Sequence, residues 1–167
     1  MLSAAADQPL DGERFDLHHL VDEVLLVAVP RGHRLARRRT VRLRELADDA
    51  FIAGSADAEK TLLRATLPAD FRPRIDIVAA EWTGKLGCVA AGLGVALIPA
   101  LAVRATPPDL ALLRLHPDDV SVRRVYAATV AGRTRSPAVR RFLTFLEEAA
   151  AGLGDPGRRR PARSRRR

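Results

Sequence analysis

The sequence contains very little cysteine and few aromatic residues. Of its 167 residues, one is cysteine, one tryptophan, one tyrosine and five phenylalanine. The single thiol, Cys88, excludes an internal disulfide framework and predicts a protein of the reducing cytoplasm. The first eleven residues also lack the basic stretch and apolar run of a secretory signal, so we do not expect secretion.

Motifs that carry enzyme chemistry are missing as well. The sequence has no G-x-S-x-G nucleophile elbow. His18 and His19 are not accompanied by further ligands at the spacing of a metal site. The Gly92-Leu-Gly94 segment follows a predicted helix, whereas a dinucleotide fingerprint follows a strand and opens a helix. We therefore expect no enzyme, no metal and no cofactor.

The net charge of +8 is concentrated at the carboxyl end. Seven arginines and one aspartate lie beyond Ala151; the remaining 21 basic and 19 acidic residues give a net charge of only +2. We expect residues 151–167 to be disordered, because they lack an apolar pattern that could form a core. One hypothesis is that this tail binds nucleic-acid phosphates without sequence preference. The alternative, which we favour, is a terminal extension without such a role. The arginines concerned are Arg158, Arg159, Arg160, Arg165, Arg166 and Arg167.

The most informative stretch runs from Ala80 to Val103. Its first half has apolar residues at the spacing of a short amphipathic helix. Thr83 stands at the N-cap position, and Gly92 stands where a left-handed residue ends a helix. Residues 95–98 form a continuous apolar run before Pro99, which predicts a buried strand. The uncharged part of the stretch is long enough to span a membrane, but its glycines and Pro99 argue against a membrane helix.

Apolar runs and amphipathic segments alternate along the rest of the chain. We predict strands at residues 24–29, 51–53, 74–79, 95–98, 110–115 and 124–130, and helices at residues 41–47, 58–66, 83–91 and 137–151. Ser136 should cap the last helix, with Pro137 in its first turn. Strands that alternate with helices predict an α/β fold with a mostly parallel sheet.

Four segments also carry a family signature. They are Val89–Pro99 (VAAGLGVALIP), Glu23–Ala36 (EVLLVAVPRGHRLA), Leu43–Leu46 (LREL) and Arg135–Phe142 (RSPAVRRF). In content and in order they resemble the effector-binding domain of LysR-type transcriptional regulators, although Arg34 replaces the proline usual in the second segment. The resemblance covers about residues 9–150. It implies a two-lobed fold of the type 2 periplasmic-binding-protein class and a role as a sensor of a small molecule in transcription regulation.

The resemblance also implies a division of the chain. We expect a disordered lead-in over residues 1–12, an effector-binding domain over 13–150, and the tail over 151–167. Within the domain, the second lobe should comprise about residues 51–122, and the first lobe residues 13–50 and 123–150. No winged helix-turn-helix precedes this part, so we expect an N-terminally truncated regulator with an incomplete first lobe. The faces of residues 24–29 and of Phe142 and Leu146 should then be poorly covered.

A ligand in this fold lies between the lobes, near helix amino ends whose free N–H groups attract anions. Two places fit: the loop after the strand at 51–53 and the start of the helix at Thr83. We therefore expect a small effector, anionic by preference, at Thr83, Trp82, Gly84, Ser55, Gly54 and His33. Structural roles stay open for several of them, since Thr83 could be a plain N-cap, Trp82 a packing residue and His33 a hydrogen-bonding residue. Lys85 could attract an anion or simply be solvated.

The leading hypothesis is thus the effector-binding domain of a LysR regulator without its DNA-binding module. A free-standing solute-binding lobe is one alternative, and a nucleic-acid-associated protein acting through the tail is another. Contact with DNA would require the missing domain or, weakly, the tail. The resemblance implies a homodimer, but one of the helices that family members pair in dimers is not found, and we expect no membrane partner.

Overall fold

The computed structural model describes residues 2–3, 14–57, 68 and 70–153. The larger of two bodies is built on a four-stranded sheet in the order β4-β8-β3-β7. Its strands are β4 (Thr40–Val41), β8 (Leu110–Leu115), β3 (Leu25–Pro30) and β7 (Ala96–Pro99). Strand β3 lies in the middle, antiparallel to both β7 and β8, while β4 runs parallel to β8.

Both faces of this sheet are buried at β3, because apolar residues occupy every position of this strand. Leu25, Val27 and Val29 point into one core cluster, and Leu26 and Ala28 into the other. Strands β7 and β8 divide their side chains between the same two clusters with the same period of two. The two clusters are formed by residues between 24 and 120, so the stable core lies in this body.

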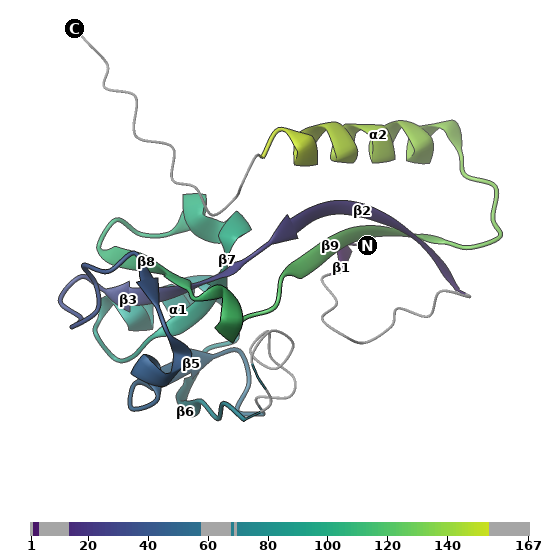
Figure 1. Cartoon of the computed structure of the whole chain (residues 1–167). Helices are drawn as coiled ribbons and strands as arrows, with labels where there is room; N and C mark the ends of the chain where they lie inside the picture. Colours follow the sequence, from purple (N-terminus) through teal and green to yellow (C-terminus); the bar gives the residue numbers. More distant parts are fainter. Residues whose placement is uncertain (1, 4–13, 58–67, 69, 154–167) are drawn as a thin grey trace, which may run out of the picture.

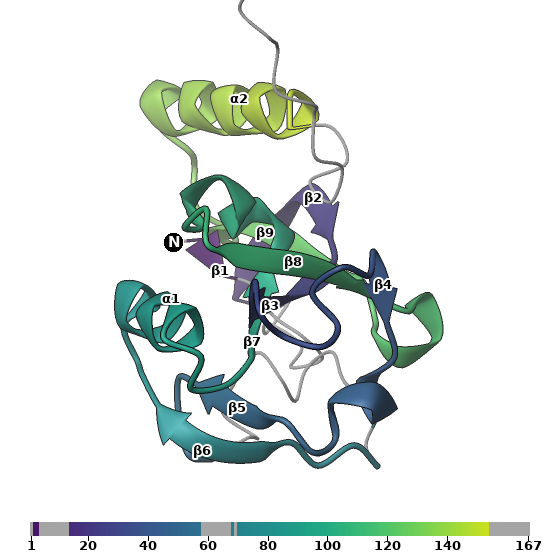
Figure 2. The same cartoon turned by 90° about the vertical axis from the view of Figure 1, so that its left-hand side faces the viewer.

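Helices and a separate two-stranded sheet surround the four-stranded sheet. Helix α1 (Trp82–Ala90) packs on one face through Leu86 and Val89, and the 3₁₀ helix η1 (Leu43–Leu46) covers the other. Strands β5 (Ala50–Ala53) and β6 (Arg74–Val78) form a parallel pair at the end of the molecule opposite α2 (Figure 2). Two further 3₁₀ helices, η3 (Ala100–Ala105) and η4 (Pro117–Asp119), follow β7 and β8.

The smaller body consists of a three-stranded sheet and one helix. The sheet has the order β1-β9-β2, with β1 (Leu2–Ser3), β9 (Arg123–Val130) and β2 (Phe15–Glu23) all antiparallel. Helix α2 (Pro137–Ala151) lies across this sheet (Figure 1). The chain crosses between the bodies where β2 leads directly into β3 and where β9 begins (Figure 1).

Three features of this arrangement correct the sequence-based expectations. The α/β class is right, but the sheets are mixed and mostly antiparallel, because β3 lies between β7 and β8 and runs in the opposite direction to both. Strand β2 was not predicted at all. The segment 24–29 was expected in the first lobe with a poorly covered face; instead β3 pairs with β7 and β8, and residues 25–29 are at most 4% exposed.

The ends of the two α-helices test the capping predictions. Gly92 has φ = 78°, the left-handed conformation predicted for the residue that ends α1. The N-cap of α1, however, is Glu81 rather than Thr83, because the helix begins at Trp82. Ser136 caps α2 as predicted, since its hydroxyl accepts a hydrogen bond from the Val139 N–H at 3.3 Å. The predicted helix at 58–66, the lead-in 1–12 apart from β1 and most of the tail lie outside the described residues.

The Ser136 cap gives a prediction for stability. Replacing Ser136 with alanine leaves the first N–H groups of α2 without this acceptor, so the free energy of unfolding should fall by about 1 kcal/mol. Chemical denaturation of the two proteins measures the difference. Ser136→Asp is the matched control, because aspartate can also cap the helix and should retain most of the stability. An equal loss in both variants would contradict the assigned cap.

Candidate functional site

The amino end of α1 is open. Its N-cap, Glu81, is extended (φ = −78°, ψ = 136°) and its side chain makes no capping hydrogen bond. Thr83 and Gly84 in the first turn are exposed, and Trp82 is half-buried. The first N–H groups of a helix have no partner within the helix, so an uncapped end offers donors and a partial positive charge to a ligand.

The loop after β5 lies beside this helix end. The carbonyl of Ala53 accepts a hydrogen bond from the Ala79 N–H at 2.8 Å, which holds the end of β5 next to the segment that enters α1. A Cβ atom placed on Gly54 would be 3.8 Å from the Lys85 ammonium. The Ser55 hydroxyl accepts a hydrogen bond from the Asp57 N–H at 3.1 Å, so it stabilises its own loop. The fold therefore brings Gly54 together with the first turns of α1.

Lys85 is the charged group at this place. Its ammonium lies 5.6 Å from the centre of the Trp82 ring, and burial lowers the pKa of Lys85 below that of an exposed lysine. Among the described residues, no carboxylate forms an ion pair with it. A partly desolvated cation that has no counter-ion among the residues the structure describes, next to an uncapped helix end, favours the binding of an anion.

The structure does not bring His33 to this site. Its Nε2 atom lies 3.1 Å from an Asp49 carboxylate oxygen, and its Nδ1 atom accepts the Leu35 N–H at 3.3 Å. Asp49 directly precedes β5 and Gly54 directly follows it, so His33 and the Gly54 loop lie at opposite ends of that strand. His33 has the structural role that the sequence left open.

The described residues contain no group of three potential metal ligands. The arginines of the tail lie beyond the described residues.

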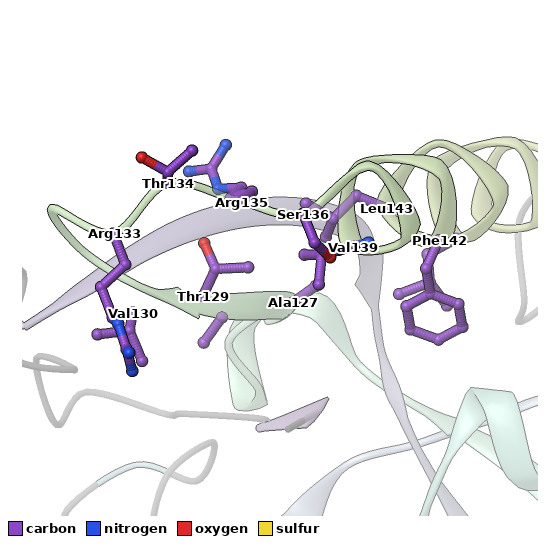
Figure 3. Close-up of a pocket in the computed structure, with 12 residues that line it drawn as sticks. Ala127, Thr129, Val130, Arg133, Thr134, Arg135, Ser136, Val139, Phe142 and Leu143 are labelled. Atoms are coloured by element: carbon purple, nitrogen blue, oxygen red, sulfur yellow. Dashed lines mark hydrogen bonds between the residues drawn. The ribbon is translucent and has the colours of Figure 1, made fainter.

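A separate groove of about 440 Å³ lies between β9 and α2 (Figure 3). Thr129 and Ala127 lie on the strand side, and Val139 and Phe142 reach toward them from the helix. Phe142 is 60% exposed, which confirms that its face is poorly covered. The full lining is Ala127, Ala128, Thr129, Val130, Arg133, Thr134, Arg135, Ser136, Val139, Phe142, Leu143 and Leu146. None of these residues belongs to the site at α1.

Comparison with known families now identifies the chain. The family model described as LysR substrate binding domain matches residues 4–151. This chain is a LysR substrate-binding domain.

Within the part of the chain that the structure describes, no helix is long and apolar enough to span a membrane.

Relatives of this LysR domain agree with the match. A Bacillus subtilis (strain 168) protein described as the uncharacterized HTH-type transcriptional regulator YwbI is 31% identical over 103 residues, which cover 60% of this chain and 34% of that protein. The chain thus spans about a third of the length of this relative. The effector-binding domain of QuiR, solved with shikimate, has a TM-score of 0.71 at 21% identity over 90% of this chain and 72% of that one. The regulatory domain of Synechocystis PCC6803 CcmR, solved with 2-PG, has a TM-score of 0.71 at 21% identity over 91% of this chain and 74% of that one. These structures share the type 2 periplasmic-binding-protein-like fold.

Lys85 is not among the site residues expected from the sequence of this LysR domain. One signal could have pointed to it, because Lys85 is the single basic residue between Ala80 and Val103. The burial of the Lys85 side chain could not be predicted from the sequence, because it depends on the packing of the Gly54 loop against α1.

Proposed function

We propose that this LysR domain binds a small anionic effector at the amino end of α1 and reports its presence to the transcription machinery. LysR substrate-binding domains are regulatory ligand-binding modules. The proposed role is binding without catalysis, in the cytoplasm where such regulators meet DNA. Contact with DNA would be made by another part of the regulator. QuiR with shikimate, which carries a carboxylate, supports an anion as the ligand class.

The observation that carries the proposal is the environment of Lys85. The ammonium is partly desolvated and has no carboxylate partner among the described residues, while the first turn of α1 offers uncapped N–H groups beside it. An anion bound there would receive charge-assisted hydrogen bonds from Lys85 and from the backbone of Thr83 and Gly84. The hydroxyl of Thr83 and the loop at Gly54 and Ser55 would provide the remaining contacts.

Thermal unfolding with a ligand panel tests the proposal. The panel should contain shikimate, inorganic phosphate and, as a neutral match for shikimate, its methyl ester. An anion present at about 100 times its dissociation constant should add about 2.7 kcal/mol to the free energy of unfolding and raise Tm by several degrees. The methyl ester should give a clearly smaller shift than the acid. Equal shifts for acid and ester, or no shift with any anion, would contradict the proposal.

A free-standing solute-binding lobe would pass the same ligand test, so a second experiment separates the two functions. The DNA-binding part of YwbI can be joined to this domain and assayed on a reporter that carries a YwbI site. A regulatory domain should make reporter output depend on the added anion. Output that does not change, with the anion bound in vitro, would favour a solute-binding lobe.

A further inference from the structure

The groove between β9 and α2 is apolar along most of its length. Val139, Phe142 and Leu146 line it from the helix, and Ala127 lines it from the strand (Figure 3). Val139 and Phe142 are 40% and 60% exposed, although they border a concave surface. The volume of about 440 Å³ lies within the range of small-molecule sites. Exposed apolar side chains around a hollow of this size are typical of a binding site for an apolar ligand.

The groove is elongated along α2. Its lining begins at Ser136, the N-cap of the helix, and reaches Leu146, ten residues further along the chain. At a rise of about 1.5 Å per residue, this segment spans about 15 Å along the helix axis, which is about the length of an extended acyl chain of ten to twelve carbons. A single aromatic ring would occupy only part of this length. The shape therefore favours a linear apolar chain as the ligand.

Cationic and polar groups line one end of the groove, where the turn after β9 leads into α2. Arg135 donates a hydrogen bond from Nη2 to Asp16 at 2.5 Å, but its Nε atom is buried and has no hydrogen-bond partner among the described residues. Arg133 lines the same end, and no carboxylate of the described residues pairs with it. The Ser136 hydroxyl accepts the Val139 N–H and keeps its own hydrogen as a donor. A buried donor without an acceptor, next to an unpaired cation, favours a carboxylate at this end.

We propose that this groove binds an unesterified fatty acid of medium chain length, with its carboxylate at Arg135 and Arg133 and its acyl chain along α2. The end of the chain lies near Leu146 and covers the exposed faces of Val139 and Phe142. The Arg135 Nε atom gains the acceptor that the described residues do not provide. This site shares no residue with the anion site at α1, so the proposal does not depend on the function proposed for that site.

Isothermal titration of the full chain with decanoate, octanoate and hexanoate tests the proposal. Decanoate should bind at one saturable site per chain, and each pair of methylene groups removed should weaken binding about tenfold, because their apolar contacts are lost. The alcohol 1-decanol has the same chain without the charge and should bind about tenfold more weakly than decanoate. Equal affinities for the acid and the alcohol, or for the three acids, would overturn the proposal.

Two phenylalanines of α2 provide a matched pair of variants. Phe142 lines the groove and Phe145 does not, and both are exposed, so the fold should tolerate aspartate at either position. Phe142→Asp places a carboxylate inside the groove and should weaken decanoate binding at least about tenfold. Phe145→Asp should leave the dissociation constant unchanged. Circular dichroism of both variants checks that α2 is retained.

A second pair of variants tests the cationic end. Arg135→Gln should weaken decanoate binding about tenfold and leave the binding of 1-decanol unchanged, because the alcohol has no charge to pair. Arg141→Gln is the control, since Arg141 is an exposed cation of α2 that does not line the groove, and it should change neither affinity. The absence of saturable decanoate binding would overturn the proposal. Equal losses in the two aspartate variants, or in the two glutamine variants, would overturn it as well.

Discussion

Replacing Arg123 with methionine should lower the free energy of unfolding by about 3–5 kcal/mol, the largest effect we expect from a single substitution in this protein. Arg123 Nη1 lies 2.6 Å from a carboxylate oxygen of Glu23, and the two side chains are 11% and 0% exposed. The other carboxylate oxygen of Glu23 accepts the Leu101 N–H at 3.1 Å. The substitution leaves the Glu23 carboxylate buried without its counter-ion, which is costly in a medium of low dielectric constant.

Two further variants separate a buried charge from lost packing. Glu23→Gln combined with Arg123→Met removes both charges and keeps an oxygen for the Leu101 N–H, so this double variant should be markedly more stable than Arg123→Met alone. Arg124→Met, at the exposed neighbouring position of β9, should change stability by less than about 0.5 kcal/mol. Urea denaturation measures all three. If the double variant is as unstable as Arg123→Met, the ion pair does not explain the effect.

The location of this pair gives it a role beyond stability. Glu23 ends β2 and Arg123 begins β9, the two places where the chain passes between the bodies, and the residues face each other in the β2–β9 register. The Glu23 carboxylate also accepts a hydrogen bond from the Leu101 N–H, which belongs to η3 of the larger body. A buried, paired charge has few alternative positions, so it fixes the geometry of the crossing.

Replacing Lys85 with methionine should weaken the binding of an anionic effector about ten- to hundredfold, because hydrogen bonds to charged groups contribute about 1.5–3 kcal/mol. The same change should raise the stability of the ligand-free protein, since the parent partly buries a cation for which the described residues provide no carboxylate partner. Isothermal titration with shikimate or inorganic phosphate measures the affinity, and thermal unfolding measures the stability. A variant that loses affinity and gains stability is characteristic of a binding residue, whereas a packing residue would lose stability.

Arg104→Met is the matched control for Lys85. Arg104 is an exposed cation on η3, so its loss changes the net charge of the protein equally. If both variants weaken binding to the same extent, the effect reflects the overall charge and Lys85 has no specific role. A normal affinity in Lys85→Met would exclude the ammonium from the site altogether.

The lowered pKa of Lys85 also sets the sign of the pH dependence. A bound anion favours the charged ammonium, so affinity should be constant near neutral pH and fall as the pH rises through the lowered pKa. Between that pKa and the higher pKa of the unfolded chain, the unfolded state binds more protons. The free energy of unfolding of the ligand-free protein should therefore rise with pH across this window, and Lys85→Met should lack this rise.

The larger body could be predicted from the sequence because its signals are local. The apolar runs of β7 and β8 and the glycine turn at Gly92 depend on neighbouring residues, and each was placed to within a residue or two. The need for glycine at Gly94, in contrast, comes from a contact that is distant in sequence, since a side chain there would overlap with the Ala50 carbonyl. The four family segments then selected the type 2 fold, which the family match confirms.

The rest depends on contacts that are distant in sequence. Strand β2 has no regular alternation, and its register shifts between His19 and Val21, so the segment acquires its strand character from pairing with β9 more than a hundred residues away. The N-cap of helix α1 lies two residues before the predicted cap at Thr83, because the segment from β6 continues extended only as far as Glu81. The burial of Lys85 also depends on a contact that is distant in sequence, the packing of the Gly54 loop against α1, so it could not be inferred from the sequence.

Backbone amide chemical shifts during titration with shikimate and with inorganic phosphate test the central claim most directly. If an anion binds at the start of α1, the largest changes should occur at the amides of Thr83, Gly84 and Gly54 and at the indole N–H of Trp82, and they should be lost in Lys85→Met. Saturable changes confined to the groove between β9 and α2, with the Thr83 and Gly84 amides unaffected, would contradict it.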